Sequence, residues 1–547
     1  MFKKHPKGLP VLFFTEMWER FGFYLMLGIF FLYMIDTQTG GLGLTRTEAA
    51  DIYGTYIALV YLTPFLGGLL ADRVLGYRRS IFLGGTLFAL GYIGLAIPGY
   101  TAFYISLLFI IVGNGFFKPN ISTLLGNLYN DPKYKDLKDS GYNIFYMGIN
   151  IGAFICNFIA AYLRNYYGWG YAFAAAGIGM FIGLIWFMSG QKHVKEADIR
   201  KPTQKEDMSL PRIFSVILLP AAITGTIGWF IPDNLFGSDS TDAFIFACIP
   251  ILSFYFSLWF RASKEDKAPI GALLSIFFVV IIFWAIFHQN GSALTIWAES
   301  YTDRKLPVAA ETIAGTFGLV QKVDTENREV PKLDSLGRAV LDDEGKIIME
   351  LGPHPYFFNL AKDQWPEEGK DLKLLSTEIF QSINPFFVVI LTPVVVGFFG
   401  WLRRRKKEPS TPAKIGWGLF ITALSTLVMV GAVIYSDNGM IKSSAMWLLG
   451  SYMVITIGEL FLSPMGLSLV SKLSPVRITS LMMGGWFLST SVGNKLSGVI
   501  SGLWDSIDNK IYFFLINFSG AMIAAIAIFL MIKWLRRVVE EQQAAKS

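Results

Sequence analysis

Three ionisable residues, Glu16, Glu19 and Arg20, lie inside an apolar stretch that runs from about residue 11 to residue 34. In the middle of a lipid bilayer each such charge costs roughly 2.5–3.5 kcal/mol, so it persists only where it faces a protein interior. Glu16 stands three residues before Glu19 and four before Arg20, which places all three side chains on one side of a helix. A mixed acidic and basic cluster on one side of a membrane helix is typical of a solute or proton pathway.

Two further ionisable residues at membrane depth differ in sign along the chain. Lys118 lies in GNGFFKPNIS, where Gly115 and Pro119 predict a bent helix that lines a cavity. Glu459 lies in ITIGELFLSPMG and has no basic residue near it in its own apolar stretch. A cavity between the two halves of the chain would have a basic and an acidic wall, which matches a zwitterion. A buried carboxylate that exchanges its ion pair for a proton would also couple proton binding to helix movement.

Four other polar residues in apolar stretches have both a functional and an ordinary explanation. His288, in IIFWAIFHQNGS, fits a proton site and a satisfied core histidine equally well. Asn150 and Asn384 offer amides that either bind a substrate or join neighbouring helices. Lys495 lies near the outer end of its apolar stretch, where we expect its long side chain to reach the membrane interface.

The elements that must position these residues are membrane helices. Hydrophobic residues make up 53% of the 547 residues and charged residues only 16%, whereas soluble domains carry about 25% charged residues. Stretches of about 20 apolar residues predict membrane spans, and the chain is an all-α integral membrane protein with fourteen of them. The predicted spans are residues 11–35, 48–70, 80–97, 101–125, 143–163, 170–188, 213–231, 243–260, 270–298, 379–402, 412–435, 444–468, 479–501 and 511–534.

Basic residues in the short loops set the orientation of these spans. They concentrate in alternate loops, including residues 73–79 and 403–407, which we assign to the cytoplasmic side. The short loops on the other side carry only Arg46, Arg164, Lys442 and Lys510. Both termini are therefore predicted to be cytoplasmic.

The seventh and eighth spans differ from the others because they contain no Asp, Glu, Lys or Arg. They follow the longest cytoplasmic linker, so we predict an inserted hairpin between two six-helix halves; membership of a plain fourteen-helix bundle is the alternative. The predicted domains are 1–190 (N-terminal six-helix bundle), 191–268 (linker and hairpin), 269–301 (first helix of the C-terminal bundle), 302–378 (extracytoplasmic segment) and 379–547 (five further helices and a cytoplasmic tail).

The extracytoplasmic segment contains a tandem repeat of eight residues, LDSLGRAV at 333–340 and LDDEGKII at 341–348. Each unit combines an Asp and Gly turn with a short β-prone run, which predicts a small β-meander. A disordered loop is the alternative, because so small a hairpin is marginal alone. The acidic residues of the repeat lack the spacing of an EF-hand, so we expect solvated turns and no metal site.

Several other classes of function are excluded. Cys156 and Cys248 both lie in apolar runs, which predicts small buried core residues and neither a disulfide nor a metal site. The net charge of +6 comes from basic residues scattered through loops, which is not a nucleic-acid signal. There is no nucleotide-binding loop and no nucleophile–base pair at membrane depth, so we expect neither a cofactor nor an enzyme.

Several strings resemble those of the proton-coupled oligopeptide transporters, a branch of the major facilitator superfamily. EMWERF looks like the family's ExxERF motif, and VYLTPFLGGLLADRVLGYRRSI resembles its second-helix and loop signature, with the superfamily element at Gly68, Asp72 and Arg73. GNGFFKPNIS, FYMGINIGAF, FQSINP and GELFLSPMG are similar to further family blocks in the same order. The resemblance covers nearly all spans and implies the major facilitator fold. Two extra helices between the halves are usual in bacterial members, whereas the long outer segment is not.

The resemblance implies a role for each candidate residue. Glu16, Glu19, Arg20 and Lys118 would form the proton-linked network. Arg20 and Lys118 would also face the peptide carboxylate, and Glu459 would hold the peptide amino terminus. The peptide backbone would contact the amides of Asn150 and Asn384, and the side-chain pockets would be shaped by Tyr24, Tyr61, Trp284 and Trp486.

Three positions depart from the family pattern. The family usually has a basic residue seven positions beyond the motif arginine and an acidic residue four positions after the ninth-span tryptophan, and these commonly pair as an outer gate. Here the two positions are Leu27 and His288, which indicates a coordinated exchange. Phe23 also stands where an aromatic hydroxyl is common. We hypothesise that His288, with a reference pKa near 6.5, takes over part of the proton titration.

The function that the resemblance implies is secondary active import of di- and tripeptides by proton symport and alternating access. The expected partners are the peptide, protons and the lipid bilayer, and the expected setting is a monomer in a plasma membrane, the inner membrane of a bacterium. One alternative is proton-coupled transport of another peptide-like zwitterion or carboxylate. A second is a membrane sensing or scaffold protein whose outer segment recruits a partner.

Overall fold

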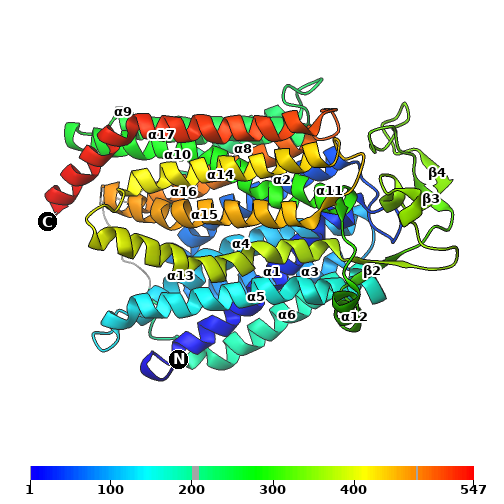
Figure 1. Cartoon of the computed structure of the whole chain (residues 1–547). Helices are drawn as coiled ribbons and strands as arrows, with labels where there is room; N and C mark the ends of the chain where they lie inside the picture. Colours follow the sequence, from blue (N-terminus) through cyan, green and yellow to red (C-terminus); the bar gives the residue numbers. More distant parts are fainter. Residues whose placement is uncertain (1, 200–208, 476–478, 547) are drawn as a thin grey trace.

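The computed structural model is a bundle of long helices with an outer segment across one end (Figure 1). It describes residues 2–199, 209–475 and 479–546. Twelve helical segments in this part of the chain are long and apolar enough to cross a membrane. Two less apolar helices, α3 and α16, are 19 and 24 residues long and lie among them. Each of the fourteen predicted spans is therefore helical.

The helices of the N-terminal half pack mainly on one another. α1 lies against α5 and α6, α3 lies against α4 and α6, and α2 lies against α4. α2 begins at a capping box in which the Thr45 hydroxyl accepts from the Glu48 N–H and the Glu48 carboxylate accepts from the Thr45 N–H. The helices are α1 (Gly8–Ile35), α2 (Arg46–Leu70, continued by a π-helical turn Ala71–Leu75), α3 (Tyr77–Leu95), α4 (Tyr100–Leu128), α5 (Lys138–Tyr167) and α6 (Trp169–Gly190).

In the C-terminal half α14 lies against α15 and α17, α10 against α16 and α17, and α13 against α15. The intervening hairpin of α8 and α9 touches α2 and α10. The domain bounds themselves stay a prediction, and part of the predicted linker, residues 200–208, lies outside the described residues. The helices are α7 (Leu210–Ile213, continued by a π-helical turn Phe214–Leu218), α8 (Leu219–Trp229), α9 (Asp239–Phe260), α10 (Lys264–Phe287), α11 (Ala293–Ser300), α13 (Ile383–Arg404), α14 (Thr411–Tyr435), α15 (Ala445–Leu473), α16 (Thr479–Gly502) and α17 (Lys510–Lys546).

The span predicted at 270–298 is divided in two. α10 ends at Phe287, a 3-10 turn covers His288–Gly291, and α11 follows. The backbone carbonyl of Asn290 that this break frees accepts hydrogen bonds from Thr295 Oγ1 (3.0 Å) and Gln381 Nε2 (2.8 Å). Non-helical backbone at membrane depth is tolerated only where the protein satisfies it in this way.

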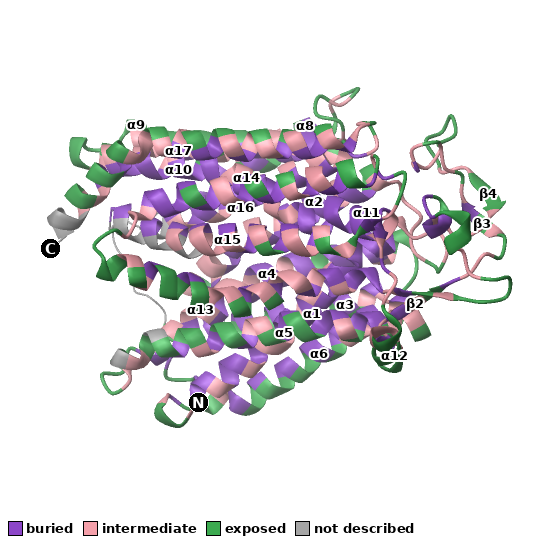
Figure 2. Cartoon of the chain, viewed as in Figure 1, coloured by how far each residue is buried: buried purple, intermediate pink, exposed green. Residues whose placement is uncertain are grey.

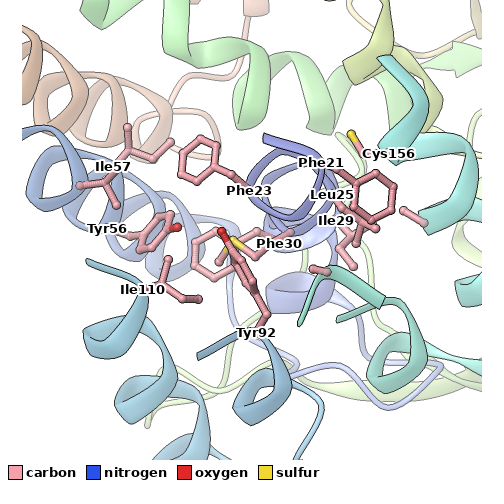
Figure 3. Close-up of a cluster of buried hydrophobic side chains, with 14 of the residues drawn as sticks. Phe21, Phe23, Leu25, Ile29, Phe30, Tyr56, Ile57, Tyr92, Ile110 and Cys156 are labelled. Carbon is pink, nitrogen blue, oxygen red and sulfur yellow. The ribbon is translucent and has the colours of Figure 1, made fainter. Parts of the chain in front are cut away.

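The two halves meet closely along α2 and α16. A Cβ atom on Gly54 would lie only 2.7 Å from the Cα of Gly498, so this approach requires glycine. Burial is concentrated along the middle of the bundle, whereas α5 and α13 expose long outer faces (Figure 2). A cluster of buried side chains surrounds α1, and Cys156 lies in it as the predicted core cysteine (Figure 3).

The outer segment contains one short α-helix, two 3-10 turns (Pro355–Phe357 and Lys362–Gln364) and strands of three small sheets. α12 (Val308–Thr316) precedes an antiparallel pair of β2 (Val320–Val323) and β5 (Leu372–Leu375). A second antiparallel pair joins β3 (Arg328–Pro331) to β4 (Met349–Gly352). β1 (Thr302–Asp303) pairs in parallel with β6 (Ser443–Ser444), which ties the segment to the loop before α15.

The tandem repeat forms two like turns between β3 and β4. The Asp334 carboxylate accepts from the N–H groups of Leu336 and Arg338, and Asp342 accepts in the same way from Glu344 and Lys346. Residues 332, 340 and 348, which are eight apart, hydrogen-bond to one another through their backbones. The predicted meander is therefore wrong in topology, because the repeats are turns closed on one another and not successive strands.

Candidate functional site

A cavity of about 350 Å³ lies between the two halves, enclosed by α1, α2, α4 and α5 on one side and by α10, α13, α15 and α16 on the other. Of the twelve residues predicted for the site, all but Glu19 line it. Glu19 reaches the cavity only through Arg20, to which it binds. The lining residues are Glu16, Arg20, Tyr24, Tyr61, Lys118, Asn150, Trp284, His288, Asn384, Glu459 and Trp486.

The charged cluster of α1 is buried at the N-terminal wall. The Arg20 guanidinium binds Glu19 with two donors, Nε to Oε2 and Nη2 to Oε1, the latter at 2.6 Å. Its Nε also lies 3.4 Å from Glu16 Oε1, and the group lies over the Phe23 ring at 4.9 Å. The second carboxylate oxygen of Glu16 is buried and has no hydrogen-bond partner in the part of the chain that the structure describes. One guanidinium thus serves two carboxylates and leaves one oxygen unsatisfied.

Lys118 on α4 is the second cation of this wall. Its ammonium lies 4.5 Å from the centre of the Tyr61 ring, a cation–π contact. Lys118 takes part in none of the ion pairs formed by the described residues. An ammonium that faces a cavity without a carboxylate partner is available to an anionic group of a ligand.

The C-terminal wall presents the opposite charge. Glu459 on α15 accepts a hydrogen bond from Asn384 Nδ2 at 3.0 Å, and the same amide donates to Thr456 Oγ1 at 2.9 Å. Among the described residues Glu459 forms no ion pair. The Asn384 amide orients the carboxylate without neutralising it, so Glu459 can accept from a ligand amine.

Aromatic rings fill the space between the charged walls. The rings of Tyr61 and Trp284 lie 6.5 Å apart, and His288 lies 5.8 Å from Tyr61 and 5.3 Å from Trp284. His288 Nδ1 is 3.3 Å from the backbone carbonyl of Trp284. Leu27 lines the same cavity, so both exchanged positions belong to it. Asn150 donates to the Tyr146 carbonyl of its own helix at 2.9 Å.

Sequence reasoning missed a ring of polar residues at the broken span. Gln381 donates to the Asn290 carbonyl, as does the Tyr452 hydroxyl at 3.3 Å, and Asn157 donates to Ser382 Oγ at 3.0 Å. The signal that marks this region is the polar run HQNGS at residues 288–292, in the middle of an apolar stretch. Further lining residues missed are Tyr53, Tyr146, Asn157, Asn290, Gln381 and Tyr452.

Above the cavity, toward the outer segment, ion pairs join the two halves. Lys495 on α16 lies 2.6 Å from Asp51 on α2 and has only 3% of its side chain exposed. The prediction that Lys495 reaches the interface is therefore wrong, because Asp51 gives it a partner inside the protein. Lys495 also donates to Thr55 Oγ1 and Ser240 Oγ, so the inserted hairpin takes part in this contact.

Two further cross-half pairs lie nearer the outer surface. Arg46 lies 3.2 Å from Asp505, and Arg164 lies 2.7 Å from Glu378. We call these two pairs and Asp51–Lys495 the outer closure. A second cavity, of about 510 Å³, is lined by Arg46, Arg164 and Asp505 of this closure together with residues of the outer segment.

The family model described as "POT family" matches residues 78–312 and 372–528. An uncharacterized transporter, YclF, of Bacillus subtilis is 32% identical over 96% of this chain and 94% of its own length. A di-/tripeptide transporter of Lactococcus lactis is 31% identical over the same shares of each chain. A crystal structure of a POT family transporter in complex with 5-aminolevulinic acid is 26% identical, covers 97% of both chains and superposes with a TM-score of 0.76.

Proposed function

This chain belongs to the POT family, and on that premise we propose that it imports di- and tripeptides together with protons by alternating access. It is a multi-pass membrane transporter and not an enzyme, as are the relatives that it matches. The observation that carries the substrate class is the cavity with Arg20 and Lys118 on one wall and Glu459 on the other. A peptide is a zwitterion whose carboxylate and amine fit these two walls.

In this proposal the peptide carboxylate binds Lys118 and Arg20, and the amine binds Glu459. The Lys118 ammonium lacks a carboxylate partner among the described residues, and Glu459 lacks a cation, so a peptide supplies both. The backbone of the peptide contacts Asn150 and Asn384. The side-chain pockets are formed by the aromatic lining residues Tyr24, Tyr61, Trp284 and Trp486.

Proton coupling in this proposal resides in the carboxylates of α1, with Arg20, Lys118 and His288. Because Arg20 binds Glu19 through two donors and Glu16 through one longer contact, Glu16 is the carboxylate more easily released from its pair. A proton on Glu16 neutralises its carboxylate, weakens the pair with Arg20 and so leaves Arg20 available to an incoming carboxylate. Proton binding and peptide binding are thereby linked at one guanidinium.

Alternating access requires the halves to separate at the outer closure and to rejoin on the other side. We place both termini in the cytoplasm; they lie at the end of the bundle opposite the outer segment (Figure 1). We also place the protein in the inner membrane of a bacterium. The cavity is complete within one chain, which supports a monomer as the transporting unit.

The test is peptide-driven proton flux in liposomes that contain the purified protein, with Glu459→Gln and Lys118→Ala. Each substitution removes one wall of the cavity, and we expect peptide-driven flux to fall by about 100-fold or more, the loss of one desolvated charge pair. Glu344→Gln and Lys346→Ala are matched controls, because they change the same residue types in an exposed pair of the outer segment. Undiminished flux in both cavity variants would refute the site assignment.

A second candidate is transport of another peptide-like zwitterion or carboxylate. The exchange of the usual gate pair for Leu27 and His288 favours it, as does the relative whose structure holds 5-aminolevulinic acid. Uptake of labelled Ala-Ala, with unlabelled dipeptides and 5-aminolevulinic acid as competitors, separates the two. Competition by dipeptides at low concentration supports the first candidate, and Ala-Ala uptake that resists a large excess of dipeptides supports the second.

The sensing or scaffold alternative is tested by removing the outer segment. The Leu375 N–H donates to the Arg304 carbonyl at 2.9 Å, so the ends of this segment lie side by side and a short linker can replace about residues 308–370. Retained peptide uptake makes the segment accessory to transport. Loss of a bound partner protein with retained uptake would instead point to recruitment.

A further inference from the structure

α12 is a helix of nine residues at the edge of the outer segment, and one of its faces is uncovered (Figure 2). Val308, Ile313 and Phe317 expose 81%, 63% and 64% of their surface. No residue of this face is charged: it consists of Val308, Ala309, Thr312, Ile313, Thr316 and Phe317. Contiguous apolar surface on an outer segment marks an interaction site.

The two threonines do not make this face polar. Thr312 Oγ1 donates to the Val308 carbonyl at 3.0 Å, and Thr316 Oγ1 donates to the Thr312 carbonyl at 2.8 Å. Both hydroxyls are thus satisfied by the backbone of their own helix. Their methyl groups remain to continue the apolar surface between the larger side chains.

The opposite face of α12 carries its one charged residue. Glu311 binds Lys373 of β5 at 3.0 Å, and Ala314, with 8% exposed surface, packs toward the segment. The helix is therefore divided into a face of Glu311 and small residues, held by the outer segment, and an uncharged face turned away from it. This division is typical of a helix that lies at an interface between water and an apolar medium.

The position of α12 identifies that medium. Gly318, just after the helix, packs on the rings of Tyr162 and Tyr166 of α5, and α5 in turn lies against α6; Figure 1 shows α12 at this end of the bundle. Asn165 Nδ2 fixes this contact by donating to the carbonyls of Gly318 (3.0 Å) and Val320 (3.1 Å). Tyr166 and Tyr171, at the outer ends of these two membrane helices, expose 61% and 62% of their surface. Exposed tyrosines at span ends mark the headgroup level of a bilayer.

We propose that the uncharged face of α12 docks on the bilayer, at the boundary between headgroups and acyl chains, beside α5. The occupant is lipid because the face continues the tyrosine belt and carries no charge for a soluble partner to recognise. This inference goes beyond peptide transport and requires only that the chain spans a membrane. It makes α12 the anchor of the outer segment on the lipid surface.

The test uses the full-length protein in phosphatidylcholine vesicles with an environment-sensitive NBD label on Ile313→Cys. The matched control is the same label on Leu351→Cys, because Leu351 on β4 is an equally apolar residue of the outer segment with 76% exposure. Both native cysteines are buried, so the wild-type protein carried through labelling supplies the blank. Retained peptide uptake by each labelled variant shows that it is folded.

We expect lipid spin-labelled near the headgroup to quench the fluorescence of the Ile313→Cys label about three or more times as strongly as aqueous iodide does. For the Leu351→Cys label we expect iodide to be the stronger quencher by a similar factor. Equal behaviour of the two labels would overturn the proposal. Protection of the Ile313→Cys label from both quenchers, with disulfide cross-linking between chains of that variant, would replace lipid by a second copy and also overturn it.

Discussion

Two lysines inside membrane helices illustrate how the central cavity differs from the outer closure. Lys118 faces the cavity, lies over the Tyr61 ring and forms no ion pair with the described residues. Lys495 donates to Asp51, Thr55 and Ser240, with each distance between 2.6 and 2.8 Å. The same residue type is left available in one region and is fully satisfied in the other.

Glu16 in the cavity and Asp51 in the outer closure show the same contrast. Glu16 shares Arg20 with Glu19 and keeps a buried oxygen that has no partner among the described residues. Asp51 accepts from Lys495 and from the hydroxyls of three residues at the start of α9: Ser238, Ser240 and Thr241. Buried polar groups are normally satisfied, and those that are not need a ligand or a functional reason. Glu16 is thus left available to a ligand or a proton, whereas Asp51 is held by its partners; Glu378, in the Arg164 pair, also keeps one buried oxygen without a hydrogen-bond partner among the described residues.

The largest expected effect comes from removing the shared cation of the cavity. Arg20→Met leaves Glu16 and Glu19 buried without a counter-charge, which costs about 3–5 kcal/mol for a buried pair. We expect peptide uptake to fall by more than about 100-fold, because the carboxylate site and the proton link are lost together. Uptake in liposomes and thermal unfolding of the detergent-purified protein measure the two effects.

Arg20→Lys distinguishes the effect of the positive charge at this position from that of the two parallel hydrogen bonds to Glu19. Lysine keeps the positive charge but cannot bind Glu19 through two parallel donors. We expect stability to be largely restored and proton coupling to remain impaired. Full uptake by Arg20→Met would contradict the view that the cavity depends on this guanidinium.

The second largest effect concerns the outer closure, which is tested by substituting its lysine, Lys495. Lys495→Met removes the cation that joins α2 to α16 and leaves Asp51 with hydroxyl partners only. We expect the outward-open state to gain about 1.4 kcal/mol relative to the closed one, a tenfold change in population. A membrane-impermeant maleimide, applied from outside to a cysteine at the cavity residue Asn157, measures this population.

Asp51→Asn combined with Lys495→Met is the control for this change. It removes both charges and keeps polar groups at the start of α9 in contact with α2. Partial return of the labelling rate toward wild type is expected, since no buried charge is left unpaired. An unchanged rate in Lys495→Met itself would show that the closure does not depend on the pair.

Much of the fold was predictable because each span must satisfy its own backbone and therefore shows a long apolar run. The exceptions depend on contacts between distant segments. The break at His288–Gly291 depends on Gln381 and on the Tyr53 hydroxyl, which leaves no room for a Cβ atom at Gly291. The closed turns of the tandem repeat depend on backbone bonds between units, which a propensity argument does not contain.

For the site, too, residue type and membrane depth were predictable from the sequence, whereas contacts with distant residues were not. Charge at membrane depth was sufficient to select Glu16, Arg20, Lys118 and Glu459, which line one cavity. Lys495 was misread because its partner Asp51 is 444 residues away in the sequence. Sequence alone gives no distance between such residues, so it does not distinguish an ammonium in an ion pair from one at an interface.

A third and smaller effect concerns His288, in the less satisfied region. We expect His288→Gln to change the uptake rate by less than about tenfold at any pH, because the proposal assigns most of the proton coupling to the α1 carboxylates. The ring is packed against Tyr61, Trp284 and Phe287, and the nearest cation on a facing helix is Lys118, over Tyr61. Initial uptake rates across pH 5 to 8 provide the measurement, and an unchanged profile would refute the His288 hypothesis.

The double variant Leu27→Arg with His288→Glu sharpens this test. It restores the charge pair that is usual in the family at two positions lining one cavity. We expect this variant to fold and to show a steeper pH profile than wild type. If its profile matched that of His288→Gln, the charge at these positions would be irrelevant to coupling.

The smallest expected effect concerns His354, in the outer segment. Burial is the main cause that lowers the pKa of His354 to about 4; Arg304, Arg328 and Lys442 lower it further, whereas Glu299 raises it. In the folded segment Nδ1 accepts from the Tyr356 N–H at 3.1 Å, which suits the neutral ring. Between pH 6.5 and 4 the unfolded segment therefore binds a proton that the folded segment does not, and its stability falls as the pH falls.

This loss is below about 2 kcal/mol, because His354 keeps partial contact with solvent. Hydrogen exchange of amides around Tyr356 should accelerate as the pH is lowered through this range, after correction for intrinsic rates. His354→Gln should flatten that dependence, while His193→Gln at the other end of the bundle should leave it unchanged. We expect the uptake profile to be unchanged in His354→Gln, because the proposal places proton coupling in the cavity; a shifted profile would contradict that assignment.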